Sequence, residues 1–248
     1  MTRCSWLPSL ARAWACATYL MARRFPRASL ARGWASASAL TLTLTLGAAA
    51  PATAAGPLDR QQALQALGHA DPLRRLEAMV RLADIGTAAD AEALMPRLLD
   101  ADPTLRQAAV AIVWRLWGRS GDAAIDTLYQ QGMQLMQSGQ LPRAVVVFTD
   151  IIARRPAFAE AWNKRATLYY MMDLYELSMK DCDEVLKRVP NHFGALSGYS
   201  QMLAERDQPE RALEYLERAY RVNPGIGNAE PAIEDLRRRI ELKRKKST

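Results

Sequence analysis

Cysteine and histidine are scarce in this 248-residue chain. The two histidines, His69 and His192, lie far apart and have no cysteines at ligand spacing, so they do not suggest a metal site. Cys4 and Cys16 fall in an N-terminal segment, which leaves Cys182 alone downstream and excludes an intramolecular disulfide there. We therefore expect neither a metal ion nor another cofactor.

The sequence also lacks the motifs that position catalytic groups. It contains no nucleophile elbow, glycine-rich phosphate loop or HExxH pair. Asp181, Asp183 and Glu184 form an acidic cluster, but such a cluster is more typical of a solvated helix face than of a metal or acid–base site. Trp114 and Trp117 are three residues apart on one helix face, where core or repeat-junction packing is favoured over ligand stacking. We predict that the protein is not an enzyme.

Acidic residues are absent from the N-terminal segment. Residues 1–58 contain six arginines, no lysine and no acidic residue. Of the 33 basic residues in the chain, 27 therefore remain downstream, against 26 acidic ones. A nearly neutral body lacks the electrostatic footprint of a nucleic-acid-binding protein, so we expect no nucleic-acid partner.

This arginine-rich segment is typical of a targeting peptide. A basic stretch precedes an uncharged apolar run at 39–50, and small residues occupy 52–54, so we expect a signal peptide over residues 1–54 that is cleaved near Ala54. Met21, directly before the basic stretch, is a candidate for the true start. The apolar run is shorter than the roughly 20 residues that span a bilayer, which favours export to the periplasm with no stable membrane span after cleavage. An uncleaved membrane anchor and an organelle transit peptide are the alternatives.

Strand patterns are missing from the rest of the chain. No alternating apolar run of useful length appears between turn signals. Apolar residues instead recur every three or four positions, as in 76–85, 108–117 and 212–222. The fold class is therefore predicted to be all-α.

Prolines recur every 34 residues, at Pro156, Pro190 and Pro224. Turn-forming and small residues follow the same step: Gly139, Asp173 and Asp207, then Ala144, Ser178 and Ala212. We interpret each unit as two helices, in which the small residue lets the second helix approach the first and the proline ends it. Each pair leaves an apolar face uncovered, so neighbouring pairs must stack.

Residues 125–226 resemble three tetratricopeptide repeats (TPRs), at 125–158, 159–192 and 193–226. The matching positions are Gly132, Ala144, Phe148, Pro156, Trp162, Tyr169, Pro190, Ala212 and Pro224. The segment 159–198 is similar to one branch of exported bacterial TPR proteins. The resemblance implies a right-handed solenoid of helical hairpins, which residues 227–248, with their basic tail, would cap.

A weaker, 31-residue repeat precedes the TPR-like part. Asp71 and Pro72 recur as Asp102 and Pro103, and Arg75 recurs as Arg106. The sequence Asp-Pro is typical of a helix start, with aspartate as the N-cap and proline in the first turn. Residues 55–123 therefore resemble short bacterial HEAT-type repeats, with about four helices over 58–123.

The TPR resemblance implies a concave wall built from the first helix of each pair. Its inward positions are Tyr129, Met133, Met136, Asn163, Thr167, Tyr170, Ser197 and Gln201. Methionine and tyrosine suit a peptide or helical segment of another protein, which implies a protein–protein interaction adaptor or scaffold of the bacterial envelope. The alternative is a structural subunit of an envelope complex, packed through the convex face or the HEAT-like part. The sequence carries no signal of oligomeric state.

Chaperone-docking TPR domains bind acidic tails through a clamp of lysine, arginine and asparagine side chains. At the five equivalent positions this chain has Tyr129, Met133, Lys164, Gly194 and Gly198. Only Lys164 among them is charged, so the resemblance does not extend to binding a bare carboxylate.

Overall fold

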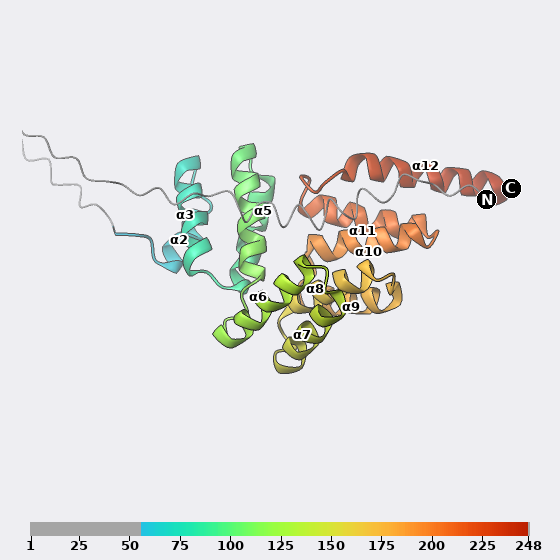
Figure 1. Ribbon diagram of the computed structural model, residues 1–248. Helices are drawn as coiled ribbons and strands as arrows, with labels where there is room; N and C mark the ends of the chain where they lie inside the picture. Colours follow the sequence, from blue (N-terminus) through green and yellow to red (C-terminus); the bar gives the residue numbers. More distant parts are fainter. Residues whose placement is uncertain (1–55, 248) are drawn as a thin grey trace, which may run out of the picture. The chain divides into compact units, whose positions relative to one another are not determined.

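A computed structural model describes residues 56–247, and the body of the protein, Leu58–Thr248, forms one compact unit (Figure 1). Residues 56–247 contain α-helices and short 3-10 helices and no strand, which confirms the all-α prediction. The expected signal peptide, including Met21 and Ala54, lies outside the described residues. Among the described residues, no helix combines the length and the apolar character needed to cross a membrane.

The N-terminal part of this unit consists of α2 (Arg60–Ala66), α3 (Pro72–Ile85), α4 (Ala91–Leu94) and α5 (Pro103–Trp117). Asp71 and Asp102 cap α3 and α5 as expected, each accepting a hydrogen bond from the backbone N–H two residues on. The helix expected between them is broken, because α4 is flanked by 3-10 turns at Ala88–Asp90 and Met95–Leu99. Pro96 lies in the second turn and supplies no amide hydrogen for a regular helix.

Three helix pairs follow, and within each pair the two helices contact one another along their length. They are α6 (Ala123–Gln137) with α7 (Leu141–Arg154), α8 (Ala159–Met171) with α9 (Tyr175–Arg188), and α10 (Phe193–Glu205) with α11 (Pro209–Val222). Contacts between α7 and α8 and between α9 and α10 join successive pairs, so the unit is a solenoid of helical hairpins.

The turn within each pair uses the residue type that the 34-residue spacing indicated. Gly139, Asp173 and Asp207 adopt left-handed backbone, with φ of 73°, 60° and 55°. Glycine has no Cβ to clash in this region, and aspartate tolerates it better than most residues. The periodic turn residues therefore set where every hairpin reverses.

Small residues allow close approach within the pairs. Ala144, Ser178 and Ala212 are buried, and the hydroxyl of Ser178 donates to the carbonyl oxygen of Ala166 at 2.7 Å. The contact between α6 and α7 also requires glycine at position 132, because a Cβ there would lie 2.8 Å from Cζ of the buried Phe148 in α7. Close packing of α6 on α7 thus depends on the absence of one methyl group.

The proline after each pair is exposed. Pro156 also helps to join the first pair to the second, through its carbonyl oxygen. The indole N–H of Trp162 donates to the carbonyl oxygen of Pro156 at 3.0 Å, and Nε of Arg188 donates to the same oxygen at 2.7 Å. The Arg188 guanidinium also lies over the Trp162 ring, 4.9 Å from its centroid.

The last helix, α12 (Ala229–Ser247), packs on α11. Arg239 of α12 donates to the carbonyl oxygen of Ala204 at 2.8 Å, and Nζ of Lys243 lies 3.1 Å from the carboxylate of Asp207. Both bonds reach the end of α10, so α12 covers the terminal pair as a cap.

Candidate functional site

The eight residues expected on the concave wall divide by burial. Tyr129, Asn163 and Ser197 are buried, with at most 7% of each residue exposed. The other five are half-buried: Met133, Met136, Thr167, Tyr170 and Gln201. Only these five present substantial surface to a partner.

Two of the half-buried residues come together across adjacent helices. The amide nitrogen of Gln201 in α10 donates to the hydroxyl of Tyr170 in α8 at 2.6 Å. The Tyr170 hydroxyl in turn donates to a carboxylate oxygen of Glu205 at 2.7 Å. Burial, followed by this hydrogen bond and the charge of Glu205, raises the pKa of Tyr170, so the phenol remains protonated at neutral pH.

Two buried members of the wall, Tyr129 and Asn163, contact the carboxylate of Glu160, at the start of α8. Nζ of Lys164 lies 2.8 Å from Oε1 of Glu160, and Nδ2 of Asn163 donates to Oε2 at 3.0 Å. The hydroxyl of Tyr129 in α6 is 3.5 Å from Oε1, at the outer limit of a hydrogen bond. Three charged or polar side chains from two helices therefore meet at one carboxylate.

The electrostatics of Glu160 follow from this arrangement. Burial alone would raise the pKa of its carboxyl group, but the charge of Lys164 and the hydrogen bond from His192 outweigh burial and lower the pKa to about 2. Burial and the nearby Glu160 charge raise the pKa of Tyr129 well above its usual value. Glu160 is thus a buried carboxylate at all physiological pH values.

His192 connects this carboxylate to the next helix pair. Its Nδ1 accepts the backbone N–H of Ala195 at 3.1 Å and so caps α10, while Nε2 lies 3.1 Å from Oε2 of Glu160. Because Nδ1 is an acceptor, the ring hydrogen is on Nε2 and is donated to Glu160. The role of the histidine is therefore structural: it caps α10 and binds Glu160.

Two tryptophans of α5 pack against His192 and Lys164, which both contact Glu160. The Trp117 indole stacks on the His192 imidazole with ring centroids 3.9 Å apart, and Trp114 meets Phe193 edge to face at 5.2 Å. The ammonium of Lys164 lies 5.2 Å from the centroid of the Trp114 ring. These contacts confirm that Trp114 and Trp117 are packing residues, here between α5 and the start of α10.

Trp114 lies against two of the positions that the TPR resemblance equates with the clamp, Lys164 and Gly194. A Cβ on Gly194 would lie 2.4 Å from Cη2 of Trp114, so glycine is needed for the indole to rest on α10. Lys164 is neutralised by Glu160 and covered by the same indole. Intramolecular packing therefore gives a physical reason why two clamp-equivalent positions, Lys164 and Gly194, are unsuited to an acidic tail.

One helical turn further along α10 the wall is open. A Cβ on Gly198 would have no neighbouring atom within 4 Å. The buried hydroxyl of Ser197 has no hydrogen-bond partner in the described part of the chain. The wall thus has open space at Gly198, and the residue before it carries a buried hydroxyl group without a partner in the described part of the chain.

The acidic cluster of α9 is only in part the solvated face that the sequence indicated. Asp183 is exposed, but Asp181 is buried and accepts two hydrogen bonds from the Arg165 guanidinium, at 2.7 and 2.8 Å. The prediction was wrong for Asp181 because its partner, 16 residues away, is brought to it by the α8–α9 hairpin. Among residues 56–247, no group of three histidine, cysteine or acidic residues is placed to hold a metal ion.

Sequence reasoning missed the central carboxylate. The spacing of Glu160 and Lys164 is that of a common surface ion pair on a helix, which gives no hint of burial. His192 and the tryptophans are brought to Glu160 from other helices, and no local pattern encodes that meeting.

No family model matches this chain. A TPR repeat-containing protein of Rhizobium etli is 34% identical over 124 residues, which are 50% of this chain and 61% of that protein. Anaphase-promoting complex subunit 7 of Dictyostelium discoideum is 30% identical over 87 residues, 35% of this chain and 15% of that protein. The chain thus spans less than two thirds of either relative. The first of them supports the interpretation of the 34-residue units as TPRs.

Among solved structures, the first TPR of Spaghetti (RPAP3) bound to the HSP90 peptide SRMEEVD is a neighbour. Its TM-score is 0.46 and its sequence identity 16%, over 47% of this chain and 93% of that one.

Proposed function

We propose that this protein is a non-catalytic adaptor of the bacterial envelope that holds a peptide or helical segment of another protein on the concave wall of its TPR-like helices. The observation that carries the proposal is the row of half-buried side chains on that wall. Met133 and Met136 offer adaptable apolar surface, while Thr167, Tyr170 and Gln201 offer hydroxyl and amide groups. This mixture suits a segment with both apolar and polar side chains.

Helix α5 limits where on the wall the partner segment can bind. Because Trp114 covers Lys164 and Gly194, the partner segment must bind beside the tryptophan, over the half-buried residues and the open space at Gly198. A bare C-terminal carboxylate is disfavoured, since Lys164 is already paired with Glu160.

The test is affinity capture from envelope extract with the full chain and two triple variants. The groove variant carries Met133→Ala, Tyr170→Ala and Gln201→Ala; Tyr129 is left intact because it is buried and its truncation would disturb the core. The matched control carries Val146→Ala, Lys180→Ala and Glu214→Ala, which are exposed positions on the second helices. We expect a partner to be lost only by the groove variant. Equal retention by both variants would move the interface away from the groove.

Export to the periplasm is the second part of the proposal and rests on residues 1–54. N-terminal sequencing of protein from the envelope fraction should give a first residue next to Ala54. A mature protein that begins at Met1 or Met21 would contradict cleavage and favour the uncleaved anchor.

A structural subunit is the alternative, and one surface feature favours it. Leu73 and Val80 of α3 are 73% and 50% exposed, and their spacing of seven puts them on one helix face. The double substitution Leu73→Ser and Val80→Ser should release the protein from an envelope complex under this alternative. It should leave groove-dependent capture unchanged under the adaptor proposal.

A further inference from the structure

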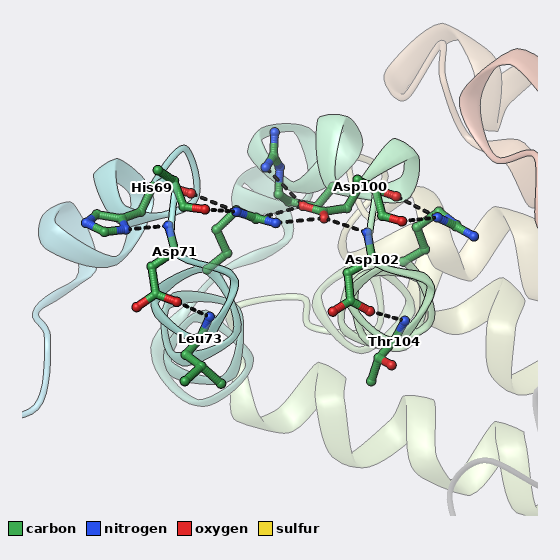
Figure 2. Close-up of polar contacts among 11 residues, drawn as sticks. His69, Asp71, Leu73, Asp100, Asp102 and Thr104 are labelled. Carbon is green, nitrogen blue, oxygen red and sulfur yellow. Dashed lines mark hydrogen bonds and ion pairs between the residues drawn. The ribbon is translucent and has the colours of Figure 1, made fainter.

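The 31-residue repeat places two arginines in the same pose, and the first shows what this pose binds. Nη1 of Arg75 donates to the carbonyl oxygens of His69 and Ala70, at 2.9 and 2.8 Å (Figure 2). Nε and Nη2 donate to the two carboxylate oxygens of Asp100, at 2.8 and 2.9 Å. The guanidinium is held in place by the two carbonyls and offers its other edge to a carboxylate.

Arg106 repeats the first half of this arrangement one unit later. Its Nη1 donates to the carbonyl oxygens of Asp100 and Ala101, at 2.7 and 3.1 Å. Figure 2 shows the parallel surroundings: the carboxylate of Asp71 caps α3 at Leu73, and that of Asp102 caps α5 at Thr104. The two arginines therefore have equivalent backbone frames.

The second half of the arrangement is missing at Arg106. Its Nε and Nη2 make no hydrogen bond or ion pair with residues 56–247, although the side chain is half-buried. The carboxylate of Asp100 cannot serve it, because that group already binds Arg75 and Arg97. Asp102 is used as a helix cap, as Asp71 is in the first unit. The 31-residue repeat ends here, so no counterpart of Asp100 follows along the chain.

We infer that Arg106 is a docking site for an aspartate or glutamate side chain of a partner protein, bound as Asp100 is bound by Arg75. The donor edge of Arg106 is oriented by its two carbonyl bonds before the partner arrives, so less freedom is lost on binding than at a mobile surface arginine. The site lies on α5 and is independent of the TPR groove. It can therefore hold even if the groove proposal fails.

The test uses the full chain with ¹⁵N-labelled arginine and follows the Nε–Hε resonances by NMR. Arg→Lys variants at Arg74, Arg75 and Arg106 assign the three signals, and all titrations use the wild-type chain. Sodium acetate is added at constant ionic strength against sodium chloride. We expect Arg106 to shift at an acetate concentration at least threefold lower than Arg74, whose ion pair with Glu77 is exposed to solvent and therefore weak. Arg75 should stay unchanged because the buried carboxylate of Asp100 occupies it. If Arg106 responds like Arg74, or if Arg75 responds as strongly, the inference is wrong.

A second titration asks whether the site recognises a carboxylate carried by protein. The probe is a blocked peptide with the sequence of residues 96–104, PRLLDADPT, which contains the carboxylate that Arg75 binds. Its matched control replaces both Asp100 and Asp102 by asparagine, so that it carries no carboxylate. The aspartate peptide should shift Arg106 at a concentration at least threefold lower than the control. Equal responses to the two peptides would reduce Arg106 to a site for small free anions and overturn its assignment as a protein-docking site.

Discussion

The carboxylate of Glu160 provides a stringent test of how α5, α8 and α10 are held together. The substitution Glu160→Gln keeps the size of the side chain and an oxygen that accepts from His192, but it removes the charge opposite Lys164. The ammonium of Lys164 would then be left in a site where only 10% of its side chain is exposed. Uncompensated burial of this kind is strongly destabilising, by roughly 3–5 kcal/mol.

The lowered pKa of Glu160 leads to a similar magnitude. Its pKa falls from 4.5 to about 2 on folding, and linkage converts this difference to about 3 kcal/mol of stability. Because the folded pKa is the lower one, this stability is fully present above pH 4.5 and is lost as pH falls toward 2. We therefore expect Glu160→Gln to lower the free energy of unfolding by about 3 kcal/mol at pH 7 and by about 1 kcal/mol at pH 3.

Urea denaturation followed by far-ultraviolet circular dichroism at pH 7, 5, 4 and 3 measures both predictions. Glu184→Gln is the matched control, since Glu184 also faces two basic side chains, Lys187 and Arg188, but at the surface of α9. Glu184→Gln should lower the free energy of unfolding by about 1 kcal/mol or less. A Glu160→Gln protein as stable as wild type at pH 7, or a loss of stability that does not change with pH, would refute the reasoning.

Three further comparisons test how the helices pack. Gly194→Ala should displace Trp114 and weaken the near-ultraviolet circular dichroism of the tryptophan pair. Gly198→Ala, with open space around it, should raise the free energy of unfolding by about 0.5–1 kcal/mol. An unchanged spectrum for Gly194→Ala together with a destabilised Gly198→Ala protein would contradict the placement of Trp114. Gly132→Ala should cost about 1–3 kcal/mol in urea denaturation through its clash with Phe148, and an unchanged midpoint would show that α7 can move away. Asp181→Asn should lower the free energy of unfolding by roughly 3 kcal/mol, because it leaves Arg165 without its buried partner. Asp150→Asn, at an exposed ion pair, should lower it by less than about 1 kcal/mol. Equal losses would contradict the burial of Asp181.

Features that depend on neighbours in sequence could be predicted. The 34-residue spacing placed the left-handed turns at Gly139, Asp173 and Asp207, because few residue types tolerate that backbone. The two Asp-Pro pairs marked the starts of α3 and α5, because an N-cap needs only an acceptor two residues before its donor. Local rules of this kind set the helices, the turns and the order of the hairpins.

Features that depend on distant segments were decided by the tertiary structure. Glu160 and Lys164 have the spacing of an ordinary surface pair, and only the arrival of His192 and the α5 tryptophans makes them a buried network. Asp181 likewise became a buried partner of Arg165 when α8 folded against α9. The sequence by itself determined an all-helical chain of repeating hairpins. Which polar groups lose contact with water, and that the space at Gly198 stays open, depended on how the helices pack, because burial is a property of all the surrounding segments together.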